Sequence, residues 1–192
     1  MLDAWLNHRL DPYLNKLMAW TEGVIRPNHL TIIGLLITLV AAVFLALGLW
    51  FVAGVIIIIG GLCDLLDGAV ARSQGRATTF GAFLDSVIDR YSDFALFIGI
   101  FFYYASTGRP YLLLLASLAA MGSFLVPFTR ARAETIIPSC KVGIMERPER
   151  IILLACGALF NLMVYVLWIL AVLTHITVIQ RILYTRKELG GP

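Results

Sequence analysis

Residues 64–89 read DLLDGAVARSQGRATTFGAFLDSVID, a stretch that links two apolar runs of the chain. Its aspartates form two pairs: Asp64 and Asp67 stand three residues apart, and Asp85 and Asp89 stand four apart. Both spacings place the members of a pair on one face of a helix. Because consecutive antiparallel helices bring the end of one beside the start of the next, we expect the two pairs to converge.

The composition of the chain excludes most soluble proteins. Of its 192 residues, 60% are hydrophobic and only 14% are charged, whereas soluble domains carry about a quarter of charged residues. Disordered chains are poor in apolar residues, so this class is excluded as well. The three cysteines do not have the spacing of a disulfide framework or a metal site. They are interpreted as small apolar residues that fill space between helices. The chain is therefore predicted to be an integral membrane protein.

The apolar runs have the length of membrane spans, which need about 20 residues each. We predict an all-α integral membrane protein with about six transmembrane helices. Four of them are expected at 31–49, 51–70, 79–104 and 111–128, and the last two within 150–184, separated near Phe160 and Asn161.

The first 22 residues differ from these spans. Their apolar side chains recur on one helical face, while Asp3, His8, Arg9 and Lys16 fall mostly on the other. This pattern predicts an amphipathic helix at the membrane surface, or one packed on the rest of the protein. No cleavable signal peptide is recognised. The chain is thus divided into this helix at 1–22, a transmembrane domain at 23–188 and a tail at 189–192.

The basic residues predict the orientation of the spans. With six helices, 13 of the 15 lysines and arginines fall on the side of the two termini, Arg109 falls on the other side, and Arg90 lies within a helix. Basic residues favour the cytoplasmic side. We therefore expect a multi-pass protein of the cell membrane, with both termini and the aspartates at the cytoplasmic face.

Carboxylates within membrane helices are costly and usually mark a functional site. Four of them in one place repel each other unless cations neutralise them, and hard oxygen ligands suit Mg²⁺. Glycines flank the acids and allow a close approach of ligands, and Arg72 is placed to reach a phosphate. These residues together predict a site for a diphosphate with two metal ions.

The complete pattern is Asp64-x2-Asp67-Gly68-x2-Ala71-Arg72-x8-Gly81-x3-Asp85-x3-Asp89. It resembles the signature of the CDP-alcohol phosphatidyltransferase family, and the resemblance covers nearly the whole chain. It implies an Mg²⁺-dependent enzyme, with Mn²⁺ able to substitute, that transfers the lipid-bearing phosphate of a CDP-lipid to an alcohol and releases CMP. It also implies a homodimer in the lipid bilayer, with no nucleic-acid partner.

The resemblance further implies roles for individual residues. Asp64, Asp67 and Asp85 match ligands of a two-metal centre, and Asp89 matches a residue that both touches a metal and acts as the general base. The residues implied to bind the CDP-lipid are Asn28, His29, Leu30, Thr31, Gly68, Ala71, Arg72, Thr78 and Gly81. The lipid itself, diacylglycerol or archaeol, is left open.

A second polar cluster bears on the acceptor alcohol. Arg132, Lys141, Arg150 and Arg181 are expected to line a pocket for a second anionic group, because the arginine fork suits phosphate. The surrounding sequence resembles the branch of the family that uses inositol 1-phosphate. The bias of basic residues toward one side would by itself explain most of this cluster.

Other functions remain open on the residues alone. Glycerol 3-phosphate or serine are alternative acceptors for the same reaction. Intramembrane acids also mark ion pathways, so an ion-coupled transporter is a rival, as is a prenyl-transferring enzyme that uses aspartates and Mg²⁺. CMP release from a CDP-lipid distinguishes the three classes.

Overall fold

The structure is a computed structural model that describes residues 27–73 and 78–190. The predicted surface helix at 1–22 lies outside these residues and stays a prediction. The described residues form six helices: α2 (Pro27–Ala46), α3 (Trp50–Ser73), α4 (Thr79–Ser106), α5 (Pro110–Ala133), α6 (Arg147–Leu159) and α7 (Met163–Glu188). The predicted all-helical class and the number of helices in this part of the chain are confirmed.

The break between the last two helices is also confirmed. Helix α6 ends at Leu159 and α7 begins at Met163, and between them Asn161 adopts a positive φ of 55°. Asparagine tolerates this left-handed conformation better than most residues. Most other boundaries extend past the apolar runs, although α2 ends at Ala46, before the predicted end at Leu49. Helix α2 begins at Pro27, because proline is favoured at the first helical position, and α5 continues through Pro127 to Ala133.

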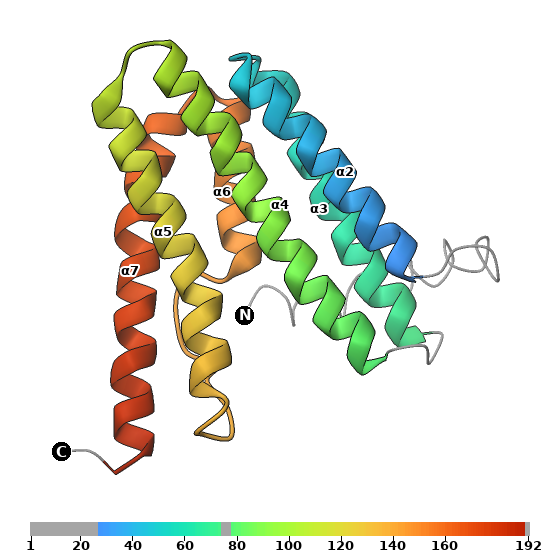
Figure 1. The fold of residues 1–192 in the computed structure, drawn as a ribbon, viewed down its shortest axis with the longest axis vertical. Helices are drawn as coiled ribbons and strands as arrows, with labels where there is room; N and C mark the ends of the chain where they lie inside the picture. The colour runs from blue at the N-terminus through green and yellow to red at the C-terminus, as the bar shows by residue number, and fades with distance from the viewer. Residues whose placement is uncertain (1–26, 74–77, 191–192) are drawn as a thin grey trace.

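The helices form two groups joined by α6 (Figure 1). In one group α2 packs against α3 and α4, and in the other α5 packs against α7. Helix α6 contacts α3 of the first group and α7 of the second, and α4 contacts α5. The first residues of α6 therefore stand beside the polar end of α3.

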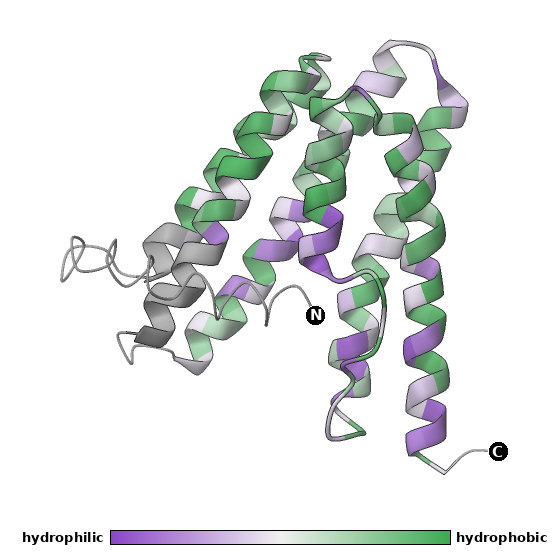
Figure 2. Cartoon of the chain, turned by 180° about the vertical axis from the view of Figure 1, so that it is seen from behind, coloured by the Kyte–Doolittle hydropathy of each residue, from purple (hydrophilic) through white to green (hydrophobic). Residues whose placement is uncertain are grey.

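The surface of the bundle is apolar over most of its height. Large side chains such as Phe51, Phe102 and Trp168 are more than half exposed, which is unusual for a protein in water. In Figure 2 the strongly hydrophilic residues gather toward one end of α4, α5, α6 and α7. By length and composition, α5 and α7 are the two described helices long and apolar enough to cross a membrane, and Thr31–Ala46 and Trp50–Asp64 are shorter apolar helices.

The contact between α2 and α4 depends on a glycine. A Cβ atom at Gly99 would lie 2.3 Å from the backbone oxygen of Ala42. Small residues allow this kind of close approach between membrane helices. Because the opposing atom belongs to the backbone, it cannot move away as a side chain would.

We expect Gly99→Ala to destabilise the protein. Overpacking typically costs about 1–3 kcal/mol, which outweighs the gain of up to about 1 kcal/mol from better helix propensity. The melting temperature of the purified protein in detergent should fall by a few degrees. Gly34→Ala on α2 is the control, because a Cβ there meets no atom within 4 Å. A Gly99→Ala protein at least as stable as the wild type would contradict this packing.

Candidate active site

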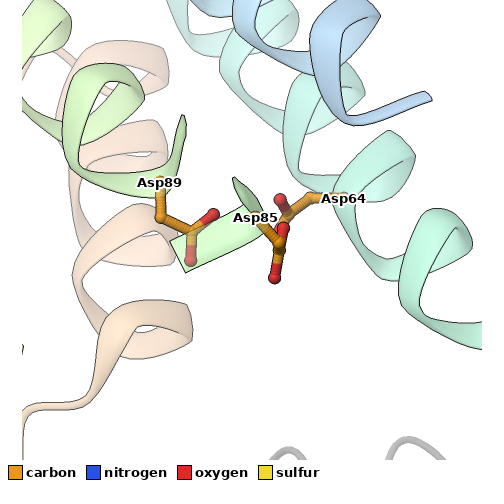
Figure 3. A group of neighbouring side chains, drawn as sticks. All are labelled: Asp64, Asp85 and Asp89. Atoms are coloured by element: carbon orange, nitrogen blue, oxygen red, sulfur yellow. The ribbon is translucent and has the colours of Figure 1, made fainter. Parts of the chain in front are cut away.

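Three aspartates from two helices meet at the polar end of the first helix group. Asp64 comes from α3, and Asp85 and Asp89 lie one turn apart on α4. One carboxylate oxygen from each lies within 4.8 Å of the other two (Figure 3). Asp89 is buried, and Asp64 and Asp85 are partly exposed. The structure thus brings together three of the four aspartates that the spacing predicted to converge; the side chain of Asp67 lies outside the described part.

An arginine that the sequence did not single out contacts this cluster. Arg147, the first residue of α6, donates an Nη1 hydrogen bond to Asp64 Oδ2, and the same atom lies 2.9 Å from Asp89 Oδ1. Its Nε donates to Asp93 Oδ1 at 3.3 Å. One guanidinium group therefore pairs with carboxylates from both α3 and α4.

A second arginine near the start of α6 repeats this pairing at greater depth. Arg150 is only 2% exposed, and its Nη2 donates to Asp93 Oδ2 at 2.7 Å. A buried arginine needs such a partner, because an unpaired charge in the interior is strongly destabilising. Asp93 lies one turn beyond Asp89 and holds α6 against α4.

One carboxylate oxygen of the cluster lacks a well-aligned hydrogen-bond donor among the described residues. Asp89 Oδ1 is buried and accepts no well-aligned hydrogen bond within the described residues, although Arg147 lies nearby. Buried carboxylate oxygens normally have a hydrogen-bond partner. A group of close, hard oxygen atoms with one atom unsatisfied suits a divalent cation such as Mg²⁺.

An apolar cavity of about 210 Å³ leads away from the cluster. It is lined by residues of α2, α3, α4 and α6, among them Gly34, Ile88 and Ile151. Asp64 and Arg147 are its charged residues. The cavity is therefore charged where it meets the aspartates and mostly apolar elsewhere.

The residues predicted to bind the CDP-lipid lie around these features. Thr31 lines the cavity. Thr78 caps α4, since its Oγ1 accepts the backbone N–H of Gly81 at 2.9 Å. The remaining predicted residues belong to α2 and α3, and their side chains lie outside the described part: Asn28, His29, Leu30, Gly68, Ala71 and Arg72.

The four basic residues predicted to bind the acceptor divide into two kinds. Arg132 and Lys141 are exposed. Arg150 is buried against Asp93, and Arg181 is 2% exposed. The structure therefore does not gather all four around one open space.

Arg181 holds the connection between α5 and α6. It donates to the backbone oxygen of Val142 at 2.9 Å and to that of Val126, and its Nη2 lies 3.7 Å from Glu146 Oε1. Arg130 pairs with the same Glu146 oxygen at 3.6 Å. Because Glu146 directly precedes Arg147, these contacts fix the start of α6 beside the aspartates.

The other end of this connection is held by Glu134. Its Oε1 accepts the backbone N–H of Cys140 at 3.2 Å and a hydrogen bond from Arg130 at 3.1 Å. Desolvation is the largest single influence and raises the pKa of Glu134, but these two hydrogen bonds and the positive charges of Arg130 and Arg181 together outweigh it and hold the pKa below its ordinary value.

Comparisons with known proteins agree on one family. The sequence profile of the CDP-alcohol phosphatidyltransferase family matches residues 24–180. The archaetidylinositol phosphate synthase of Pyrococcus horikoshii is 41% identical over 166 residues, which are 86% of each chain.

Two solved structures share the fold. The phosphatidylinositol phosphate synthase of Mycobacterium tuberculosis with CDP-DAG bound has a TM-score of 0.81 and 30% identity, over 94% of each chain. The same protein in complex with manganese and citrate has a TM-score of 0.78 and 32% identity, over 91% of this chain and 87% of that one. With its apolar outer faces, the chain is a membrane protein with helical spans.

We expect Arg181→Met to destabilise the protein strongly. The change leaves two backbone oxygens without their charged donor and removes one of the two arginines that pair with Glu146, and hydrogen bonds to charged groups contribute about 1.5–3 kcal/mol each. The free energy of unfolding in detergent should fall by about 3 kcal/mol or more. Arg132→Met is the control, since an exposed side chain should change stability by less than about 0.5 kcal/mol. Equal stability of the two variants would show that Arg181 does not hold the connection.

Proposed function

Because the chain belongs to the CDP-alcohol phosphatidyltransferase family, we propose that it transfers the lipid-bearing phosphate of a CDP-lipid to a hydroxyl group of inositol phosphate, with release of CMP. The observation that carries the proposal is the position of the aspartate cluster at the charged end of an apolar cavity. A CDP-lipid has the same two parts, a charged diphosphate and long hydrocarbon chains.

The carboxylates of this site suit two divalent ions. We propose that Asp64, Asp67, Asp85 and Asp89 hold two Mg²⁺ ions, or Mn²⁺ in their place. The close oxygens of three of these residues and the manganese complex of a relative support this. When bound, the ions polarise the phosphoryl oxygens and stabilise the negative charge of the leaving CMP.

The remaining chemistry falls to residues of the chain. Asp89 is proposed to accept the proton of the attacking hydroxyl group, since its Oδ1 is buried and lacks an aligned donor in the described residues. Arg72 is proposed to hold the donor diphosphate. The new phosphoester bond forms as the bond to CMP breaks, so the reaction needs no covalent intermediate on the enzyme.

The donor's remaining contacts follow from the same arrangement. We propose that the cavity lined by Thr31 and Gly34 takes part of the lipid, while Gly68, Ala71, Thr78 and the segment 28–30 contact the CDP group, beside Gly81. About six transmembrane helices are proposed, with the site and both termini at the cytoplasmic face, although the 13-residue α6 is too short to cross the bilayer on its own. A homodimer is proposed from the family resemblance.

Inositol phosphate is proposed as the acceptor on two grounds. A relative that is 41% identical over 86% of the chain is an archaetidylinositol phosphate synthase, and one that is 35% identical is a phosphatidylinositol phosphate synthase from Mycobacteroides abscessus. The acceptor's own phosphate is proposed to bind Arg132 and Lys141, which are exposed, within a pocket supported by Arg150 and Arg181.

The roles of Asp85 and Asp89 predict different defects. Asp85→Asn should lose both CMP release and Mg²⁺-dependent binding of CDP-lipid, because it removes a metal ligand. Asp89→Asn should keep most of the donor binding but lose about 10²–10⁴-fold in the rate of CMP release, the usual contribution of a general base. Ser86→Ala, at an exposed position of the same helix, is the control. Normal turnover in Asp85→Asn would contradict the metal site, and equal loss of binding in both would make Asp89 an ordinary ligand.

The acceptor pocket predicts a selective change in KM. Arg132→Ala and Lys141→Ala should raise the KM for inositol phosphate about ten-fold, the effect of losing one charge-assisted hydrogen bond, with little change in the donor KM. Arg186→Ala, at an exposed position of α7, should change neither. The wild type should use inositol phosphate in preference to free inositol, serine and glycerol 3-phosphate. Equal use of free inositol would exclude a phosphate pocket.

A further inference from the structure

Arg147 occupies the position that a cation would take beside the aspartates. Its Nη1 contacts the carboxylates of Asp64 and Asp89 at once, and its Nε binds Asp93. The side chain is 22% exposed, so this charge is only partly screened by solvent.

The neighbouring arginines cannot replace it. Arg90 reaches Asp89 only at 3.9 Å, and its Nε donates to the backbone oxygen of Ser86. Arg150 is committed to Asp93. Among the described residues, Arg147 is thus the cation in close contact with both Asp64 and Asp89. Without it, these two carboxylates would face each other with little compensation.

The same two carboxylates are proposed metal ligands, and this creates a conflict. A guanidinium group and a divalent cation repel each other, so each weakens the binding of the other at the oxygens that Arg147 now contacts. We propose that Arg147 is a displaceable internal counter-ion: it neutralises Asp64 and Asp89 in the metal-free protein, and divalent ions displace it from both. This inference rests on the proposed metal site.

The geometry limits the movement to a side chain. The start of α6 is fixed by Arg150 with Asp93 and by Glu146 with Arg181. The helix therefore stays in place while the guanidinium group turns away from the metal ligands. Because Arg147 also lines the cavity at its charged end, the displacement changes the entrance to the space proposed for the donor.

The first test measures Mn²⁺ affinity without substrate. Purified wild type, Arg147→Gln and the control Arg90→Gln are titrated with Mn²⁺ in detergent, and free Mn²⁺ is followed by electron paramagnetic resonance. Removing a competing cation should strengthen Mn²⁺ binding about ten-fold or more in Arg147→Gln. Arg90→Gln should change it less, because its contact is longer. Equal or weaker binding by Arg147→Gln would overturn the proposal.

The second test uses the wild-type protein, so it does not depend on a variant that folds. Phenylglyoxal modifies accessible arginines, and peptide mass spectrometry locates the products. Saturating Mn²⁺ should increase modification of Arg147 several-fold, while Arg150, which stays buried against Asp93, should remain unmodified. Unchanged or decreased modification of Arg147 would overturn the proposal. If the wild type bound no Mn²⁺, the proposed metal site itself would be wrong, and the inference would fall with it.

Discussion

The protein must hold several carboxylates close together between apolar helices without leaving their charge uncompensated. Asp64, Asp85 and Asp89 share one small volume, and Asp93 is buried beside them. In such surroundings, repulsion between like charges and the loss of hydration both oppose ionisation. In the described part of the structure, two arginines from the first turn of α6, Arg147 and Arg150, compensate this negative charge.

This requirement explains the form of the second half of the bundle. Helix α6 has only 13 residues and begins beside the aspartates, because its first turn supplies the compensating charges. The connection before it is held to α5 and α7 by buried contacts of Arg181. Arg181, which the sequence indicated as an acceptor-binding residue, thus also positions the arginine that contacts the aspartate cluster. As a member of its family, the chain is an enzyme of phospholipid biosynthesis, which excludes the rival transporter.

The sequence predicted the local features well and the distant contacts poorly. Apolar runs of membrane length predicted the six helices and the break near Asn161, and the spacing of the aspartates predicted their convergence. Arg147 lies 83 residues from Asp64, and Arg181 lies 55 from Val126. Periodicity within one helix carries no information about such pairs. The burial of Arg150 and Arg181 was missed for the same reason, because a charged residue is expected at the surface unless its partner is known.

The central claim is that the aspartate cluster is a centre for two metal ions, and its most direct test is the electron paramagnetic resonance spectrum of the Mn²⁺-loaded wild-type protein. Ions held by carboxylate oxygens that lie within 4.8 Å of one another must be close neighbours, about 3.5–4 Å apart in known two-metal sites. The account predicts two Mn²⁺ ions per chain and a spectrum broadened by coupling between their spins. A single uncoupled ion per chain, or none, would contradict it.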